Sequence, residues 1–322
     1  MAKAGFKEHM ETVGNIVIAE GYVREFERRG YLKSGAFIPE VVLEHPDLVR
    51  VLHEEFVHAG SDVVEAFTYY GHREKLRVIG REDDLERLNR TALKIARQGS
   101  RREWEEQVVW AVEENADFII AETFNDFGEA MLALEAIKKY GKSLPAVITL
   151  TAYVPEITTD DVPFPEACRK LELAGAAVVG LNCARGPWTM LPLIKKIREV
   201  CEGPIAALPV PFTTTDKYPT FQSLKDPATG KSLYPLDVIS YSCTRTEIRR
   251  FAEEAKDAGV SYIGLCCGNA SNYLREVAEV YGRKPKACKY SPDISLSYIH
   301  GREKSKEYRI ASKLRQYTGI DN

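Results

Sequence analysis

Three cysteines follow two apolar segments that have the composition of buried β-strands. Cys266 and Cys267 are adjacent in "SYIGLCCGN", and Cys183 ends "AVVGLNC". Because Gly268 follows the pair, the backbone can turn there and bring both sulfur atoms to one point. Three thiolates from two strand ends could hold one soft divalent ion, and ligation by sulfur alone favours zinc over magnesium or calcium. The competing interpretation is that these are ordinary buried thiols, since free cysteine packs like a small hydrophobe; the spacing alone does not decide between the two.

The elements that must position these residues alternate along the whole chain. Short apolar segments are separated by amphipathic helical ones, a rhythm typical of a parallel sheet. Seven strands are predicted, at 15–21, 62–70, 117–124, 145–152, 177–183, 204–210 and 261–267. Most of them end in polar or reactive side chains, and the active site of a (β/α)8 barrel collects at the carboxyl ends of its strands. The sequence therefore predicts an α/β fold, a (β/α)8 TIM barrel with carboxylates, aromatic rings and thiols at that face.

One strand of this barrel is missing from the pattern. The helix predicted at 84–98 is separated by only two residues from a second helix at 101–115, where the third strand should stand. We therefore predict a barrel that lacks its third strand and is shortened near residues 98–101. A partner subunit, or a shift of the neighbouring strands, would close the gap. No linker rich in Pro, Gly or Ser divides the chain, which predicts a single barrel domain over 1–322 with a short C-terminal helical tail.

Composition and charge exclude several classes of protein. A formal net charge of -3 argues against a nucleic-acid binder, which normally carries a basic excess. The N-terminal stretch lacks the apolar core of a signal peptide, and no apolar run approaches the ~18 residues that span a bilayer. Seven cysteines is an odd number, which does not suit a secreted disulfide framework. These features predict a cytoplasmic protein without nucleic-acid or membrane partners; a homo-oligomer stays open.

Several longer stretches give the chain a family resemblance. "FTYYGHREKL", "ADFIIAETF", "AGAAVVGLNC" and "GVSYIGLCCGN" resemble the betaine–homocysteine S-methyltransferases, which belong with the zinc-dependent homocysteine S-methyltransferases. The resemblance implies that Cys183, Cys266 and Cys267 are catalytic zinc ligands. It also implies the reaction: a methyl group moves from a small onium donor to the thiol of homocysteine, giving methionine.

The resemblance also implies a substrate pocket. Glu20 and Glu122 are expected to bind the amino group of homocysteine, and Gly21 lets the backbone approach the ligand. An onium donor is held best by aromatic faces through cation–π attraction, and the residues expected there are Tyr22, Phe37, Tyr69 and Tyr70. Tyr70 is also expected to take the open zinc position when homocysteine is absent.

The sequence departs from the family at three points of this pocket. The first strand ends "AEGYV" where the family has Asp-Gly-Gly, so Glu20 is one methylene longer and one glycine is missing. Phe37 stands where tryptophan is usual, and Thr123 stands where betaine-using members carry an aromatic residue. Betaine, S-methylmethionine and dimethylsulfoniopropionate therefore all stay open as donors.

Two other functions are compatible with the same residues. The missing strand and the altered first loop are also expected of a non-catalytic binding or scaffold protein that keeps zinc. A redox-active disulfide between Cys266 and Cys267 is the third interpretation. Turnover of homocysteine would distinguish the enzyme from the non-catalytic binding protein. Metal content would distinguish the zinc site from the disulfide.

Overall fold

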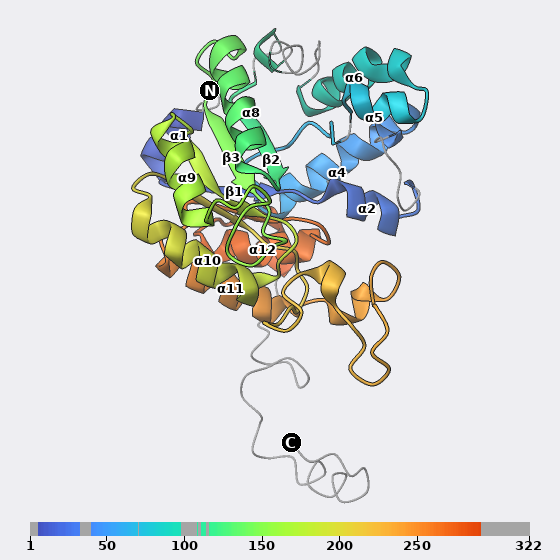
Figure 1. Cartoon of the computed structure of the whole chain (residues 1–322). Coiled ribbons are helices and arrows are strands. Elements are labelled where there is room, and N and C mark those ends of the chain that lie inside the picture. The colour runs from blue at the N-terminus through green and yellow to red at the C-terminus, as the bar shows by residue number, and fades with distance from the viewer. Residues whose placement is uncertain are drawn as a thin grey trace, which may run out of the picture. The chain divides into compact units, whose positions relative to one another are not determined.

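The computed structural model describes residues 6–32, 40–69, 71–97, 108, 111–113 and 116–290 (Figure 1). The chain divides into two compact units, Met1–Cys288 and Lys289–Asn322. Only residues 289 and 290 of the second unit are described, so the fold below is that of the first. The expected helical tail lies outside the described residues, and the single domain over 1–322 stays a prediction.

Six parallel strands form one sheet in the described part of the first unit. They are β1 (Ile16–Ala19), β2 (Ile119–Phe124), β3 (Ala146–Leu150), β4 (Val178–Asn182), β5 (Ile205–Leu208) and β6 (Tyr262–Leu265). Their order across the sheet is β1-β6-β5-β4-β3-β2, and every pair of neighbours is parallel. The first strand therefore lies beside the last, as in a barrel, while β1 and β2 end the two sides of an open sheet. The fold is a six-stranded partial barrel.

Helices follow the strands and pack against one another in the same order. The longer ones are α4 (Pro46–Ala59), α6 (Leu85–Arg97), α8 (Phe127–Tyr140), α9 (Phe164–Leu173), α10 (Pro187–Val200), α11 (Arg245–Asp257) and α12 (Ser271–Val280). The shorter ones are α1 (Phe6–Val13), α2 (Tyr22–Arg28), α3 (Val41–Glu44) and α5 (Arg73–Val78), with 3-10 turns at Glu82–Asp84, Phe221–Ser223, Val238–Tyr241 and Lys286–Tyr290. Neighbours in contact run from α8 through α9, α10, α11 and α12 to α4 and α6. This row of helices covers the outer face of the sheet.

The apolar pattern of the sequence explains why these helices pack there. In α11 the residues predicted to share one face, Ile248, Phe251, Ala252 and Ala255, are all fully buried. Its first turn is closed by a capping box, in which the Thr244 hydroxyl accepts from the Glu247 amide and the Glu247 carboxylate accepts from the Thr244 amide. An apolar stripe and a closed N-terminus are sufficient to fix this helix and its orientation.

The prediction of a full strand at 62–70 is wrong for most of the segment. Within its described part, only Val63 pairs with a neighbour, through a single parallel bridge to Ile18. Two side chains replace the backbone hydrogen bonds that a paired strand would make. Backbone amides of β1 donate to the Asp62 carboxylate and to the Ser61 hydroxyl. The segment has β1 on one side and no described strand on the other, so nothing holds it extended.

A cavity lies on the side of the sheet where the sequence predicts that the third strand is missing. As predicted, α6 covers most of 84–98, while the two-residue joint after it lies outside the described residues. A cavity of about 200 Å³ lies between α6, α8, residues 63–68 and the start of β2, and it is mainly apolar. Of the expected helix at 101–115, residues 108 and 111–113 are described and helical, and Val108 and Ala111 also line the cavity.

The inner face of the sheet is apolar at one end and polar at the other. An inner core joins α1 to alternate strand residues, among them Ile16, Ile18, Val147, Val178 and Tyr262. Since side chains alternate along a strand, residues two or four positions further along point to the same face. That alternation carries Glu20, Glu122, Asn182 and Cys266 to the inner face at the carboxyl ends. No helix among the described residues is long and apolar enough to cross a membrane.

Candidate active site

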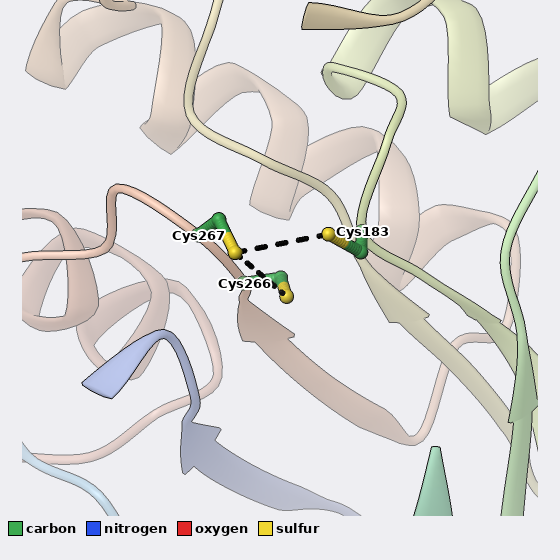
Figure 2. A group of neighbouring side chains, drawn as sticks. All are labelled: Cys183, Cys266 and Cys267. Carbon is green, nitrogen blue, oxygen red and sulfur yellow. Dashed lines mark hydrogen bonds between the residues drawn. The ribbon is translucent and has the colours of Figure 1, made fainter. Parts of the chain in front are cut away.

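The three predicted cysteines meet at the carboxyl ends of β4 and β6. Figure 2 shows Cys183 beyond one arrowhead and Cys266 and Cys267 beyond another, with their sulfur atoms gathered. The Sγ atom of Cys267 lies 3.8 Å from that of Cys183 and 4.0 Å from that of Cys266, and all three atoms lie within 4.8 Å of one another. Tetrahedral ligation at ~2.3 Å per zinc–sulfur bond requires sulfur atoms ~3.8 Å apart. The donor set and its spacing therefore fit a zinc ion.

Unusual backbone conformations bring these thiols together. Cys183 and Ala184 both have positive φ, 58° and 52°, which is rare for residues with a side chain. Gly268 follows the other two cysteines with a φ of 100°, so the chain turns at the glycine as the sequence predicts. Strain of this kind costs of order 1–3 kcal/mol per residue and is found where a site requires a particular geometry.

The thiols also modify one another's acidity. The Cys183 and Cys266 thiols both donate to the sulfur of Cys267, and these contacts lower the pKa of Cys267 well below its ordinary value. The pKa of Cys266 is raised by its interactions with the Cys183 thiol and then with the Cys267 thiol, and further by burial. Cys267 is thus the first of the three to become a thiolate, which is the form that binds a metal ion.

Gly21 brings the first loop against the paired cysteines. Its φ is 86°, and a Cβ atom added to it would lie 2.6 Å from the carbonyl oxygen of Cys266. Only glycine allows both the conformation and the approach. The close contact at Gly21 is made with the backbone that carries the thiols, and the expected approach to a ligand stays a prediction.

A second cluster, of carboxyl groups, lies beside the thiols on the inner face. The carboxyl groups of Glu20 and Glu122 interact, and a third one, that of Glu65, interacts with both. Burial, followed by repulsion from Glu122 and Glu65, raises the pKa of Glu20 well above its ordinary value, and burial raises that of Glu122 to about 7. These groups hold protons at a pH where ordinary carboxyl groups are ionised.

Asn182 connects the carboxyl cluster to the strand that carries Cys183. Its amide nitrogen donates to the Glu122 carboxylate at 2.8 Å and to the Thr123 hydroxyl at 2.7 Å. Its amide oxygen accepts from the Thr123 backbone and from the Thr149 hydroxyl, both at 3.0 Å. Asn182 is fully buried, so it fixes the orientation of Glu122 relative to the thiols.

Two of the four predicted aromatic residues, Tyr22 and Tyr69, belong to the described part of the chain. The ring of Tyr22 is buried against His53, Phe56 and Phe67, and its hydroxyl oxygen accepts from the Glu65 amide at 3.5 Å. Tyr69 is 38% exposed at the end of its segment. Phe37 and Tyr70 lie outside the described residues, so their roles stay predictions.

Different aromatic residues, which sequence reasoning missed, surround the thiols. Phe212 and Phe221 stack with their ring centres 5.6 Å apart, and they pack in one cluster with Cys183 and Cys266. The guanidinium of Arg24 lies 5.5 Å from the centre of the Tyr234 ring and helps to lower the pKa of Cys267. Tyr153, whose hydroxyl accepts from Gln222, also lies near the thiols; burial, followed by the nearby sulfur atoms, raises its pKa.

Three of these missed residues, Phe212, Phe221 and Tyr234, belong to one long connection whose length was the available signal. The chain between β5 and α11 runs from residue 209 to residue 244. Loops of such length in a compact domain are often functional. Glu65 had a different signal, because a glutamate inside a segment as apolar as "DVVEAF" is unusual unless it is buried for a reason.

Fold and site together define a class of protein: a parallel α/β partial barrel whose strand ends carry three thiols able to hold a metal ion. The homocysteine S-methyltransferase family model matches residues 17–104 and 100–281. The match is in two pieces that overlap at residues 100–104, close to the joint where the sequence predicts that the third strand is missing. This chain belongs to the homocysteine S-methyltransferase family.

Individual relatives agree with this assignment. The chain is 33% identical over 310 residues to betaine–homocysteine S-methyltransferase 1 of Rattus norvegicus, covering 86% of this chain and 75% of the relative. It is 32% identical over 310 residues to the S-methylmethionine–homocysteine S-methyltransferase BHMT2 of Pongo abelii, covering 86% and 81%. Relatives with two different methyl donors are thus equally similar to it.

A solved structure shares the fold. The oxidized form of the homocysteine methyltransferase MmuM from Escherichia coli superposes with a TM-score of 0.65 at 15% identity, covering 86% of this chain and 99% of that one. A metallated form of MmuM gives a TM-score of 0.61 at 14% identity, covering 82% and 96%. At this identity the likeness concerns the fold alone.

Proposed function

We propose that this protein is a zinc-dependent methyltransferase that moves a methyl group from a small onium donor to the sulfur of homocysteine, giving methionine. The observation that carries the proposal is the convergence of Cys183, Cys266 and Cys267, at distances that suit tetrahedral ligation. A zinc ion held there would supply the positive charge that keeps the thiol of homocysteine deprotonated at neutral pH. Family membership supplies the substrate.

The residues of the chain would position the two reactants. Glu20 and Glu122 lie on the same inner face as Cys266 and would receive the amino group of homocysteine, which directs the sulfur of the substrate toward the thiols. Asn182 would keep Glu122 in that orientation. Positioning of this kind makes methyl transfer effectively unimolecular and does not require a strong general base.

The donor is proposed to be a small sulfonium or quaternary ammonium compound. The relatives named above use betaine and S-methylmethionine respectively, by their names. The aromatic rings of Phe212, Phe221 and Tyr234 lie near the thiols. The guanidinium of Arg24 lies over two of them, which supports the attraction of a cationic group such as an onium donor by this cluster. The predicted residues Tyr69, Tyr70, Tyr22 and Phe37 stay candidates for the same role.

We further propose that the fold is an eight-stranded barrel that has lost its third strand and retains only one bridge of its second. The row of strands and helices keeps the order of such a barrel on both sides of the gap. A cytoplasmic location and a homo-oligomer stay predictions from the sequence.

The test is turnover of homocysteine by the purified zinc-loaded protein. Betaine, S-methylmethionine and dimethylsulfoniopropionate are offered one at a time with isotopically labelled homocysteine, and labelled methionine is measured by mass spectrometry. Methionine formation with at least one donor, lost in Cys267→Ser and kept in Cys201→Ser, is the expected result. Cys201 is a suitable control because it is also buried but lies outside the thiol cluster. Bound zinc without turnover of any donor would instead support the non-catalytic binding protein.

A further inference from the structure

Glu65 is a carboxyl group that the proposed reaction does not yet use. It lies two residues beyond Val63, the residue that bridges to β1, and so on the same face as the inner core. Its carboxyl group lies near enough to that of Glu122 for each to change the pKa of the other. Three carboxyl groups from three separate segments therefore meet at one point.

The cluster has no cationic partner within the described chain. Neither carboxyl oxygen of Glu20 receives a hydrogen bond from a described residue, although its side chain is only 1% exposed. The hydroxyl of Tyr262, which is close enough to feel all three carboxyl groups, is also buried without a partner. Buried polar groups normally have hydrogen-bond partners, so these atoms indicate a ligand that donates hydrogen bonds.

We propose that Glu65 is the third carboxyl group of an ammonium-binding site, and that it receives the amino group of homocysteine together with Glu20 and Glu122. An ammonium group has three N–H donors, and one of them can reach each carboxyl group. Its charge also offsets the desolvation that buried carboxylates otherwise suffer. This inference rests on the proposed function and names a residue that determines which thiol substrate is accepted.

The position of Glu65 also suits the release of a proton. The empty cluster holds protons because burial raises the pKa of each member. When an ammonium group binds, its single positive charge is balanced by ionisation of one carboxyl group, whose proton must leave, while the other two can accept N–H donors through their carbonyl oxygens. Glu65 is partly exposed and lines the cavity between α6 and α8, whereas Glu20 is closed off, so the proton leaves to solvent on the Glu65 side.

The experiment compares two thiols that differ only in the amino group. Dissociation constants of L-homocysteine and of 4-mercaptobutanoate are measured by calorimetry on the zinc-loaded protein, alongside turnover with whichever donor is active. Glu65→Gln keeps the shape and removes the charge. It is expected to weaken homocysteine binding, and to raise the KM for homocysteine, by about tenfold or more, with kcat largely kept. Binding of 4-mercaptobutanoate should change by less than about twofold.

Controls separate this role from a structural one. Glu135→Gln, on the exposed side of α8, should leave both dissociation constants unchanged. Glu65→Asp keeps the charge on a shorter side chain and should restore part of the preference for homocysteine; it also serves if Glu65→Gln does not fold. An equal loss for both thiols, or an unchanged constant for homocysteine, would overturn the role of Glu65 while leaving the methyltransferase intact. A wild-type protein that binds neither thiol would overturn the proposed function itself.

Discussion

The contact between Gly21 and the paired cysteines gives a sharp prediction, because the cost of Gly21→Ala can be divided into two parts. A non-glycine residue at positive φ costs roughly 1–2 kcal/mol, and Gly21 has a φ of 86°. In addition, the new methyl group would lie 2.6 Å from the carbonyl oxygen of Cys266, so the two backbones must separate by about 0.4–0.8 Å to reach ordinary contact distances. Overpacking of this kind adds typically 1–3 kcal/mol.

The displacement falls on the backbone that carries two of the proposed zinc ligands. Metal sites tolerate deviations of only about 0.2 Å in ligand distance. Gly21→Ala should therefore lower zinc affinity by more than about tenfold, besides lowering the free energy of unfolding of the metal-free protein by ~2–5 kcal/mol.

Gly14→Ala is the matched control for this prediction. Gly14 has a φ of 77°, but nothing lies within 4 Å of the methyl group that the substitution adds. It should cost only the conformational ~1–2 kcal/mol and leave zinc affinity unchanged. Zinc affinity is measured by competition with a chromophoric chelator, and stability by urea unfolding of the metal-free protein. Equal stability losses and equal zinc affinities in the two variants would refute the close approach of the first loop to the thiols.

Two further predictions concern the carboxyl cluster. Asn182→Ala removes four hydrogen bonds of a buried side chain and should lower the free energy of unfolding by ~2–4 kcal/mol. The control, Asn125→Ala, changes an exposed side chain and should cost less than about 0.5 kcal/mol. Equal losses for the two variants in urea unfolding would contradict the prediction. Burial raises the pKa of Glu122 from its ordinary 4.5 to about 7, so the folded state binds more protons than the unfolded state between these values. The free energy of unfolding of the metal-free protein should therefore fall as pH rises from about 4.5 to about 7, and the raised pKa values of Glu20 and Glu65 act in the same direction. Glu122→Gln should reduce this dependence of the free energy of unfolding on pH. An unchanged dependence across this range would contradict a proton held by the cluster.

The sequence predicts most of the sheet, because buried parallel strands are continuous apolar runs with clear ends. Six of the seven expected strands are present, and the segment that fails, 62–70, is the one with no described strand on its second side. Strand propensity there is as high as elsewhere, so the failure comes from lack of a partner and not from the residues themselves. The local sequence pattern does not show whether a neighbouring strand is available to pair with the segment.

The grouping of the thiols could be predicted from the sequence, because it follows from the positions of the strand ends. The aromatic residues around the thiols could not be predicted. Cys183 and Cys266 each end a strand, and parallel strands bring their carboxyl ends to one face. Phe221 and Tyr234, in contrast, lie in a long connection whose path depends on tertiary packing. Glu65 lies between these cases: alternation from Val63 places it on the inner face, but its interaction with Glu122 depends on tertiary packing.

The central claim, a three-thiolate zinc site, is tested most directly by elemental analysis of the purified protein. We predict one zinc per chain in the wild-type protein and in Cys201→Ser, and little or none in Cys183→Ser, Cys266→Ser and Cys267→Ser, with all variants folded by circular dichroism. A well-folded wild-type protein that takes up no zinc, or a Cys266→Ser variant that retains one equivalent with undiminished affinity, would contradict the account.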